Sequence, residues 1–347
     1  MSQTSTKVGL NIGLIGAGNI SDTHARAASA IPGVSIAAVY SPTRAHARRL
    51  AERHEAAAYD TLEGLLGHRP LDTVVIGSPS GLHAEHGIAA ASRGLHVLVE
   101  KPIDTTAARA DALIAEAQRA GVTLGVIFQD RLKPDVARVK TLIQDGALGQ
   151  PILATAHVKW YRAPEYYRAS SWRGTRALDG GGALMNQGVH TVDLLLWLFG
   201  PVRRVMAKTE TALHRIEVED TAVAVLEFAN GALGTIEATT AAYPGYSRRI
   251  ELTGSQGTLI LDGDSLTAVD LQTKLDEPVS AVSAPTASAN TPVVADASAH
   301  QRVFEDFVRA VANRTSPICD GVEGRRSVAL IEAIYESARV GHPVDVC

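Results

Sequence analysis

Short apolar runs alternate with segments of helical periodicity over the first 130 residues. The apolar runs cover residues 8–18, 34–41, 71–79, 96–102 and 122–129, and the helical segments cover 21–31, 43–54, 84–94 and 107–121. Continuous Val and Ile, without polar alternation, predict strands that are buried on both faces and therefore a parallel sheet. A right-handed βαβ series of this length is typical of a doubly wound α/β domain that binds a dinucleotide.

The pattern changes after the sequence Gly149-Gln150-Pro151. Alternating apolar and polar residues, separated by glycine-containing turns, predict antiparallel strands with one solvated face. We expect such strands at residues 152–160, 203–213, 220–231, 232–240, 248–257 and 258–263. The sequence therefore predicts an α+β domain built on an open, mostly antiparallel sheet.

The predicted domain boundary lies near residue 130, with a dinucleotide-binding domain at 1–130 and a substrate-binding and oligomerisation domain at 131–347. Residues 281–299 are rich in Ala, Ser, Thr and Pro, which predicts a mobile surface loop. Two helices, at 301–313 and 324–340, close the chain and could either stay with the second domain or pack back on the first. We find no internal repeats.

Charge and cysteine content exclude several classes of function. A formal net charge of −4 over 347 residues gives no reason to expect nucleic acid or an anionic membrane as a partner. The N-terminal segment lacks the pattern of a secretion signal, and no run approaches about 18 apolar residues, so no transmembrane helix is expected. Two cysteines, Cys319 and Cys347, argue against a disulfide framework and fit a reducing, cytoplasmic location.

A glycine-rich turn lies between the first predicted strand and the first predicted helix. The residues are Gly16, Ala17, Gly18, Asn19, Ile20 and Ser21. The two glycines permit a tight turn and a close approach of the backbone to a pyrophosphate, which would rest on the N-terminus of the helix. A plain glycine turn is the alternative, but the position in a βαβ series favours dinucleotide binding.

The second predicted strand ends without the acidic residue that holds the ribose 2′-hydroxyl in NAD enzymes. It ends in Tyr40-Ser41-Pro42-Thr43-Arg44, and no Asp or Glu occurs from Thr23 to Ala51. Ser41, Thr43 and Arg44 could instead accept a 2′-phosphate, which favours NADP slightly over NAD. A solvated Arg44 without a ligand is nearly as good an interpretation.

A lysine stands at the C-terminal end of the fourth buried strand, in the sequence Glu100-Lys101-Pro102. Ligands of open α/β sheets bind at that edge. An ammonium there can donate a hydrogen bond to a hydroxyl and stabilise the alkoxide that forms as hydride leaves. The tripeptide alone would equally fit a surface lysine at a strand end.

The stretch from Gly180 to Gly200 runs from a glycine-rich turn into an apolar helix. On an α-helix, Asn186 and His190 lie on one face, and Asp193 lies near the same side. Polar groups at the start of an apolar helix suggest a site, because burying them without partners costs several kcal/mol. A capped helix with one buried histidine is the alternative.

Residues 157–176 bring aromatic and basic side chains together. Sugars are bound by aromatic faces and planar donors, and arginines also bind phosphate or carboxylate groups. A structured surface loop with some core aromatics is the alternative. The candidates are Trp160, Tyr161, Arg162, Tyr167, Trp172 and Arg173.

With these motifs in place, the chain resembles the Gfo/Idh/MocA family of sugar and polyol oxidoreductases. The matching pieces are GAGNIS, the run from SPSGLH to LVEKP, GGGALMNQGVHTVDLLLWLFG, the late RRIELTGSQGTLILDG segment and the final GRRSVALIEAIYESARVGHPVDV. The resemblance implies a Rossmann domain with a nicotinamide cofactor and an open-sheet substrate domain, paired into homodimers or homotetramers. It also implies that Lys101 orients the substrate and that His190 acts as acid and base.

The resemblance extends to the residues expected around the cofactor. It places Ser78, Pro79 and His83 near the nicotinamide end, with Glu100, Lys101 and Gln129 also at the cofactor, and it gives His86 no special role. Many relatives resemble one another in having aspartate where this chain has Asn186. An amide cannot stabilise an imidazolium by charge, but it can orient the substrate or the ring of His190 by hydrogen bonds.

Together these features predict an NAD(P)-dependent oxidoreductase that acts on a secondary hydroxyl of a sugar, polyol or sugar derivative. The expected substrate-binding residues include Lys101, Tyr161, Arg162, Trp172, Arg173, Asn186 and His190. No His, Cys or Asp cluster has the spacing of metal ligands, so no metal is expected. The alternative is a non-catalytic protein that senses cofactor or sugar on the same fold.

Overall fold

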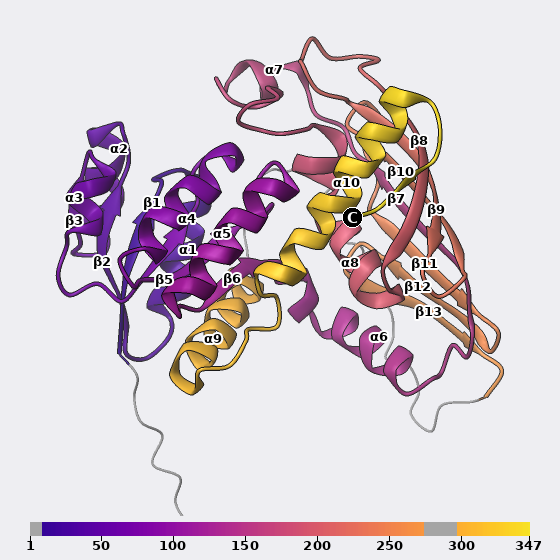
Figure 1. Cartoon of the computed structure of the whole chain (residues 1–347), viewed down its shortest axis with the longest axis horizontal. Helices are drawn as coiled ribbons and strands as arrows, with labels where there is room; N and C mark the ends of the chain where they lie inside the picture. The colour runs from indigo at the N-terminus through magenta and orange to yellow at the C-terminus, as the bar shows by residue number, and fades with distance from the viewer. Residues whose placement is uncertain (1–8, 274–296) are drawn as a thin grey trace, which may run out of the picture. The chain divides into compact units, whose positions relative to one another are not determined.

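The computed structural model describes residues 9–273 and 297–347 and divides them into two compact units (Figure 1). The first unit contains residues 9–104, 108–129 and 297–325, and the second contains residues 105–107, 130–273 and 326–347. Most of the predicted loop at 281–299 lies outside the described residues. No helix within the described ranges combines the length and apolar character needed to cross a bilayer.

The first unit contains a six-stranded parallel sheet in the order β3-β2-β1-β4-β5-β6. Its core strands are apolar because both faces are covered, and all four residues of β4 are buried. The strands are β1 Leu10–Ile15, β2 Val34–Tyr40, β3 Ala57–Tyr59, β4 Thr73–Ile76, β5 His96–Glu100 and β6 Leu124–Ile127. This arrangement confirms the predicted doubly wound domain.

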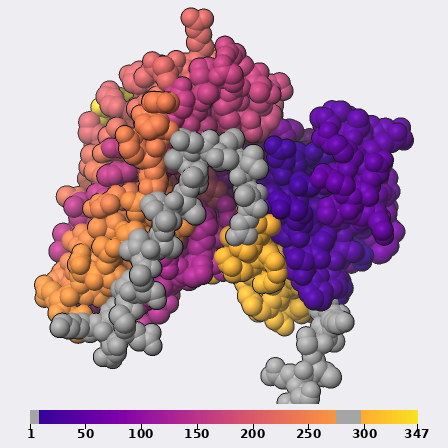
Figure 2. Space-filling model, turned by 180° about the vertical axis from the view of Figure 1, so that it is seen from behind, coloured from indigo at the N-terminus to yellow at the C-terminus, as the bar shows by residue number. Residues whose placement is uncertain are grey.

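Helices and short helical turns connect these strands, and one helix from later in the chain joins them. They are α1 Asn19–Ser29, α2 Arg44–Glu52, α3 Leu62–Leu66, η1 Ser80–Leu82, α4 His83–Ala91, α5 Ala107–Ala120 and the later helix α9 Ser298–Asn313. Although α9 lies far along the chain, it packs against α1 and adjoins the N-terminal segments in both views (Figure 2). The structure thus returns a C-terminal helix to the first unit.

The second unit contains an eight-stranded sheet in the order β13-β12-β11-β7-β10-β9-β8-β14. Within this sheet, as far as the described residues form it, only the pair β7 and β10 is parallel, so the predicted open, mostly antiparallel sheet is confirmed. The strands are β7 Pro151–Lys159, β8 Val202–Glu210, β9 Thr221–Phe228, β10 Leu233–Thr239, β11 Arg249–Gly254, β12 Gly257–Asp262, β13 Ser265–Leu271 and β14 Val344–Asp345.

Helical segments precede, separate and follow the strands of this sheet along the chain. They are η2 Gln129–Leu132, which begins at the unit boundary, α6 Pro134–Gln144, α7 Pro164–Arg168, the π-helical turn η3 Ala183–Gly188, α8 Val189–Phe199 and α10 Gly321–Val340, which contributes residues to both units. The sequence did not predict α6, α7, β13 or β14, nor α3 and β3 in the first unit. Most of these are short, and β3 and β14 are edge strands with little periodicity to detect.

One face of the second sheet differs from the expected polar surface. Outward positions hold large apolar side chains, and Val225 and Leu233 are 54% and 55% exposed. The strand register places Met206 beside Val225 and Leu153 beside Leu233 on this face. The other face is covered in part by α8, which packs against β7 and β11. The sheet therefore presents an exposed apolar surface, which we call the outer face.

Candidate active site

The glycine turn after β1 brings the backbone close to the end of β4. Gly16 has a φ of +106°, and a Cβ at this position would lie 2.7 Å from the carbonyl oxygen of Gly77. Gly18 precedes α1 and provides no side-chain cap, so the first N–H groups of the helix keep their hydrogen-bonding capacity for a ligand. Gly16, Gly18, Asn19 and Ile20 thus lie together in a turn suited to a pyrophosphate.

At the end of β2, the hydroxyl of Ser41 accepts a hydrogen bond from the backbone N–H of Thr43 at 3.3 Å. Arg44 begins α2, and its side chain is 62% exposed and 3.6 Å from the carboxylate of Asp60. Ser41 therefore stabilises the turn, while the guanidinium of Arg44 lies in solvent with one weak ion pair. Asp60 follows β3, a strand that the sequence did not predict.

His83 lies beneath the turns that follow β4 and β5. It is fully buried, with Nδ1 2.7 Å from the carbonyl oxygen of Pro102 and Nε2 2.9 Å from that of Ser78. Burial lowers the pKa of His83, against the opposing effect of these carbonyls. Both ring nitrogens are occupied by backbone, so we revise His83 from a residue that lines the cofactor to one that positions Ser78, Pro79 and Pro102.

His86 has a contact that the sequence did not predict. Its Nδ1 lies 3.0 Å from the hydroxyl oxygen of Ser78, and its ring meets that of Tyr40 edge-on. Burial lowers the pKa of His86 to about 4, so the ring is neutral near pH 7. His86 therefore holds the hydroxyl of Ser78 in place.

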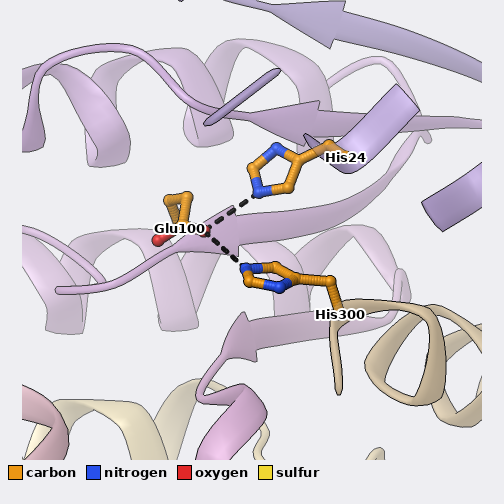
Figure 3. Close-up of side chains that lie close together, drawn as sticks. All are labelled: His24, Glu100 and His300. Atoms are coloured by element: carbon orange, nitrogen blue, oxygen red, sulfur yellow. Dashed lines mark hydrogen bonds and ion pairs between the residues drawn. The ribbon is translucent and has the colours of Figure 1, made fainter. Parts of the chain in front are cut away.

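Glu100 ends β5 as a buried carboxylate shared by two histidines (Figure 3). Its Oε1 lies 2.9 Å from Nε2 of His24 on α1 and 3.9 Å from Nε2 of His300 on α9. Its Oε2 accepts the backbone N–H of Lys101 at 2.9 Å. The carboxylate is occupied by protein groups, so we revise Glu100 from a cofactor contact to a residue that positions Lys101.

The ligand atoms of His24, Glu100 and His300 all lie within 4.8 Å of one another, which is spacing compatible with a metal ion. The sequence could not reveal this group, because its members come from three separate parts of the chain. The 2.9 Å contact between His24 and Glu100 provides a direct partner for the carboxylate without an ion. The absence of a metal therefore stays a prediction.

In the second unit, the glycine-rich turn leads into a π-helical turn rather than directly into an α-helix. A Cβ on Gly182 would lie 2.0 Å from the carbonyl oxygen of Glu219, so only glycine fits there. The buried carboxylate of Glu219 accepts the N–H groups of Gly182 at 3.0 Å and Leu184 at 2.8 Å. These contacts hold the start of η3, and the α-helical spacing assumed for Asn186 and His190 does not apply.

Asn186 in η3 is oriented by neighbouring side chains. Its amide nitrogen donates to the carboxylate of Asp179, which is 1% exposed, and its amide oxygen accepts from Gln187. Asp179, which the sequence reasoning did not single out, thus fixes the direction of the amide. Only its proximity to the GGG turn could have drawn attention to it.

Asp193 lies away from the predicted polar group. Its two carboxylate oxygens accept hydrogen bonds from Arg131 at 2.7 and 2.8 Å, and both side chains are at most 2% exposed. A bidentate arginine–carboxylate pair of this kind satisfies both charges within the interior. We therefore assign Asp193 to the packing of α8 rather than to the chemistry.

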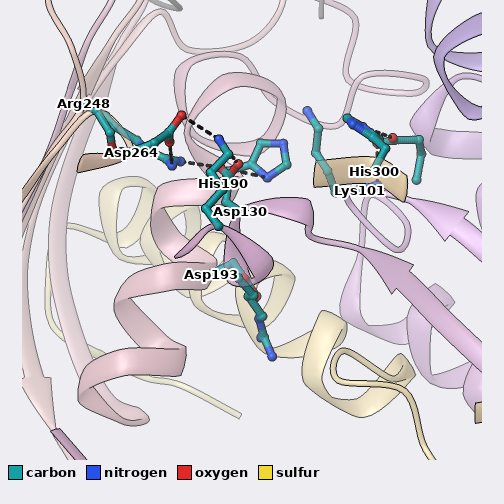
Figure 4. Close-up of polar contacts among 11 residues, drawn as sticks. Lys101, Asp130, His190, Asp193, Arg248, Asp264 and His300 are labelled. Atoms are coloured by element: carbon teal, nitrogen blue, oxygen red, sulfur yellow. Dashed lines mark hydrogen bonds and ion pairs between the residues drawn. The ribbon is translucent and has the colours of Figure 1, made fainter. Parts of the chain in front are cut away.

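His190, near the start of α8, lies beside a buried network of charges (Figure 4). Its Nδ1 is 3.7 Å from Oδ2 of Asp130, which also accepts a hydrogen bond from Arg248 at 2.5 Å. Lys133 contacts Asp130 at 2.6 Å and Asp264 at 2.7 Å. Two carboxylates and two cations thus form a balanced group next to the imidazole.

The charge state of Asp130 follows from this network. Burial by itself raises the pKa of the carboxyl, but Arg248, His190 and Lys133 hold it well below its usual value. Asp130 therefore stays ionised, and it supplies beside His190 the negative charge that Asn186 lacks. The sequence places Asp130 directly after Gln129, at the C-terminal end of a parallel strand, which is the signal that could have revealed it.

Gln129 is the last residue of the first unit before this boundary. Its Oε1 is buried and has no hydrogen-bond partner within the part of the chain that the structure describes. A buried, unsatisfied amide oxygen is costly unless a ligand or water completes it. The contact of Gln129 with the cofactor stays a prediction.

The aromatic and basic segment between β7 and η3 folds as part of the second unit. Tyr167 is a core residue, 8% exposed, with its hydroxyl 3.0 Å from Thr240 and its ring 4.8 Å from that of His214. Tyr161 contacts Tyr243 edge-on. The remaining candidates form one group around Tyr166, with Arg162 above Trp160 and Arg173 near Trp172.

A Rossmann-type unit with an open glycine turn, followed by an open-faced sheet unit with a histidine at a helix start, defines a two-unit dinucleotide-binding protein. Residues 10–128 match the oxidoreductase family with an NAD-binding Rossmann fold, and residues 136–260 match the GFO/IDH/MocA C-terminal domain. The chain belongs to the GFO/IDH/MocA family.

Individual relatives support this assignment over most of the chain. The rhizopine catabolism protein MocA of Rhizobium meliloti is 31% identical over 78% of this chain and 86% of its own. The D-xylose 1-dehydrogenase (NADP(+)) 2 of Haloferax volcanii is 31% identical over 83% of this chain and 85% of its own length. The WlbA dehydrogenase of Bordetella pertussis, solved with NADH and UDP-GlcNAcA, is 32% identical, with a TM-score of 0.87 over 98% and 99%. The chain is an NAD(P)-dependent oxidoreductase.

The contacts of Glu100 predict how stability responds to acid. The pKa of Glu100 is lowered from 4.5 to about 2, because His24, Lys101 and His300 outweigh the cost of burial. The unfolded state therefore binds a proton before the native state does, and stability is lost as pH falls from about 4.5 to about 2, by up to about 3 kcal/mol. Glu100→Gln should remove this contribution, as measured by urea unfolding across that range. Parallel stability curves for the two proteins would contradict the assignment.

Proposed function

We propose that the enzyme transfers hydride between a nicotinamide cofactor and a secondary hydroxyl, or the corresponding ketone, of a sugar, polyol or sugar derivative. The observation that carries this proposal is His190, which lies 3.7 Å from an ionised, buried Asp130 in a chain of the NAD-binding oxidoreductase family. The named relatives support the substrate class, since they include a xylose dehydrogenase and a dehydrogenase solved with a nucleotide sugar.

The proposed roles divide the reaction among three side chains. In the oxidation direction, His190 accepts the hydroxyl proton, and Asp130 stabilises the imidazolium that results. The ammonium of Lys101 donates a hydrogen bond to the substrate oxygen and stabilises the charge that develops there. A nicotinamide cofactor, held by the glycine turn at Gly16 and Gly18, would supply the hydride acceptor. Asn186, held by Asp179, orients the substrate hydroxyl with its amide.

Loss of the proposed acid–base group should abolish most of the activity. We expect His190→Ala to lower kcat by roughly 10²–10⁴, the usual contribution of general acid–base catalysis, with NADH binding unchanged by fluorescence titration. Asp130→Asn should cause a smaller loss, because the ring remains but its stabilising charge is removed. His342→Ala, an exposed histidine elsewhere in the second unit, serves as the control. Near-normal turnover by His190→Ala would remove this residue from the mechanism.

We further propose a slight preference for NADP, because the end of β2 carries Ser41 and Arg44 in place of an acidic residue. The relatives include one named as NADP(+)-dependent and one solved with NADH, so both cofactors occur among them. Arg44 is exposed and only weakly paired with Asp60, which leaves its guanidinium accessible to a 2′-phosphate.

The cofactor preference can be tested on one side chain. Arg44→Ala should weaken NADPH binding by about tenfold, the value of a charge-assisted hydrogen bond, and leave NADH binding unchanged. Arg48→Ala removes a charge from an exposed position of the same helix and is the matched control. Equal losses for both cofactors, or none, would rule out a role in 2′-phosphate recognition.

We propose that the protein forms a homodimer or homotetramer through the outer face of the second sheet. Met206, Val225, Leu153 and Leu233 gather there with exposures of 42–55%, and exposed apolar patches on a sheet commonly mark an interface. Val225→Lys should shift the species to a smaller mass by light scattering at micromolar concentration, because burying an unpaired ammonium is costly.

A control variant distinguishes the interface from a general effect of charge. Val322→Lys places the same charge on a valine of the first unit that is 53% exposed, and it should leave the mass unchanged. A monomer in the unsubstituted protein would refute the proposal directly.

We also propose a cytoplasmic location. The chain has only two cysteines, Cys319 and Cys347, in 347 residues, which argues against a disulfide framework and fits a reducing compartment. Recovery in the membrane or an extracytoplasmic fraction of the source cells would contradict it.

A further inference from the structure

The segment between β7 and η3 is basic, in contrast to the chain as a whole. Residues 160–180 contain four arginines (162, 168, 173 and 176) against one glutamate and one aspartate (165 and 179), a net charge of +2 where the chain carries −4. Two of the arginines are exposed. Arg168 forms an ion pair with Glu165, and the guanidinium of Arg176 donates to the backbone carbonyl of Glu217 at 3.0 Å. The other two turn toward the aromatic side chains.

Arg162 and Arg173 contact the same tyrosine ring. The guanidinium carbon of Arg162 lies 5.6 Å from the ring centre of Tyr166, and that of Arg173 lies 4.3 Å from it. The guanidinium carbon of Arg162 also lies 5.0 Å from the ring centre of Trp160, and that of Arg173 lies 5.5 Å from the ring centre of Trp172. We call these five residues the arginine–aromatic cluster.

The two guanidinium groups repel each other within the cluster. Burial lowers the pKa of Arg162, which is 5% exposed, and the nearby charge of Arg173 lowers it further. Stacking on aromatic faces offsets part of this cost, because the ring quadrupole attracts cations. Holding two like charges together in a partly desolvated place is nevertheless unfavourable unless something else compensates.

The protein supplies one negative charge near the cluster. Asp179 is buried, but its carboxylate accepts hydrogen bonds from the backbone N–H of Gly174 at 2.7 Å and from the amide of Asn186. Arg173 forms no ion pair with any residue in the described ranges, and its Nε is buried without a hydrogen-bond partner there. Trp160 Nε1 is likewise a buried donor without a partner in the described chain. The cluster thus keeps donors and positive charge in excess.

A chain of hydrogen bonds connects the cluster to the proposed catalytic segment. Gln187 accepts the Nε–H of Arg162 at 3.0 Å and donates to the hydroxyl of Tyr166 at 2.9 Å. The same amide nitrogen donates to the oxygen of Asn186, in the turn that leads to His190. All these residues belong to the second unit, so the cluster lies next to the groups proposed to act on the substrate.

We propose that the arginine–aromatic cluster binds an anionic group of the substrate, so that the enzyme acts on an acidic or phosphorylated sugar rather than a neutral one. A guanidinium matches a carboxylate or a phosphate with two parallel hydrogen bonds, and the anion supplies the charge that the cluster lacks. This inference rests on the proposed dehydrogenase function and specifies its substrate.

The test compares matched neutral and anionic probes on the protein saturated with NADPH or NADH. Calorimetric titration with D-glucose, D-glucuronate and glucose 1-phosphate separates the carboxylate from the phosphate, and UDP-glucose against UDP-glucuronate tests a nucleotide sugar. We expect at least one probe to bind about 10- to 100-fold more tightly than the partner that lacks its sugar carboxylate or phosphate, as for charge-assisted hydrogen bonds. The two UDP-sugars share the charge of the pyrophosphate and differ only by the carboxylate. The difference should shrink as salt is added.

Variants of one arginine locate the effect. Arg173→Gln should abolish the preference for the anionic probe. Arg173→Lys keeps the charge but cannot donate two parallel hydrogen bonds, so it should retain part of the preference. Arg168→Gln removes an equal charge from an exposed position of the same segment and should retain all of it. Thermal melting confirms that each variant is folded.

Equal affinity for neutral and anionic probes, or no binding of any anionic probe at about 10 mM, overturns the inference. So does an unchanged preference in Arg173→Gln. If the inference fails but the enzyme still oxidises a neutral sugar, and His190→Ala abolishes that turnover, the proposed dehydrogenase function stands. Conversely, anion-selective binding without hydride transfer would refute the proposed function and keep the inference about the cluster.

Discussion

Buried carboxylates organise this protein, because each can stay charged only where cations or N–H groups surround it. In the first unit, Glu100 links α1 and α9 to the end of β5 through His24 and His300 and receives the N–H of Lys101. In the second, Asp130 and Glu219 fix the surroundings of His190 and the start of η3. The side chains proposed to act on the substrate, Lys101 and His190, thus each lie next to a buried carboxylate.

The replacement of aspartate by Asn186 takes on a different meaning in this setting. The amide hydrogen-bonds with Asp179 and Gln187, so it transmits the position of one buried carboxylate instead of carrying a charge itself. The negative charge beside His190 comes from Asp130, which is itself balanced by Arg248 and Lys133. In this chain, Asn186 is therefore a neutral link between two side chains, and Asp130 on another element provides the negative charge beside His190.

Sequence reasoning succeeded where the signal is local and failed where the partners are distant. The glycine turn, the parallel strands and the open sheet follow from periodicity and turn residues within short windows. By contrast, nothing in the sequence places His300 beside Glu100, or Arg131 against Asp193, since tertiary packing alone brings them together. The interpretation of Glu100 as a cofactor contact changed for the same reason, because His24 and His300 lie far from it in the sequence. The interpretation of His83 changed because the backbone carbonyls of Ser78 and Pro102 contact both of its ring nitrogens.

The π-helical turn at Ala183–Gly188 has a consequence for how this segment tolerates insertions and deletions. A π-turn holds one more residue than the equivalent α-turn, and each residue of an α-helix rotates its successor by about 100°. Deleting a single residue here would let the segment revert to a regular helix and would swing Asn186 and Gln187 away from Asp179 and Arg162. A relative with one residue fewer in this turn would therefore present different polar side chains before the histidine that corresponds to His190, even with the same fold.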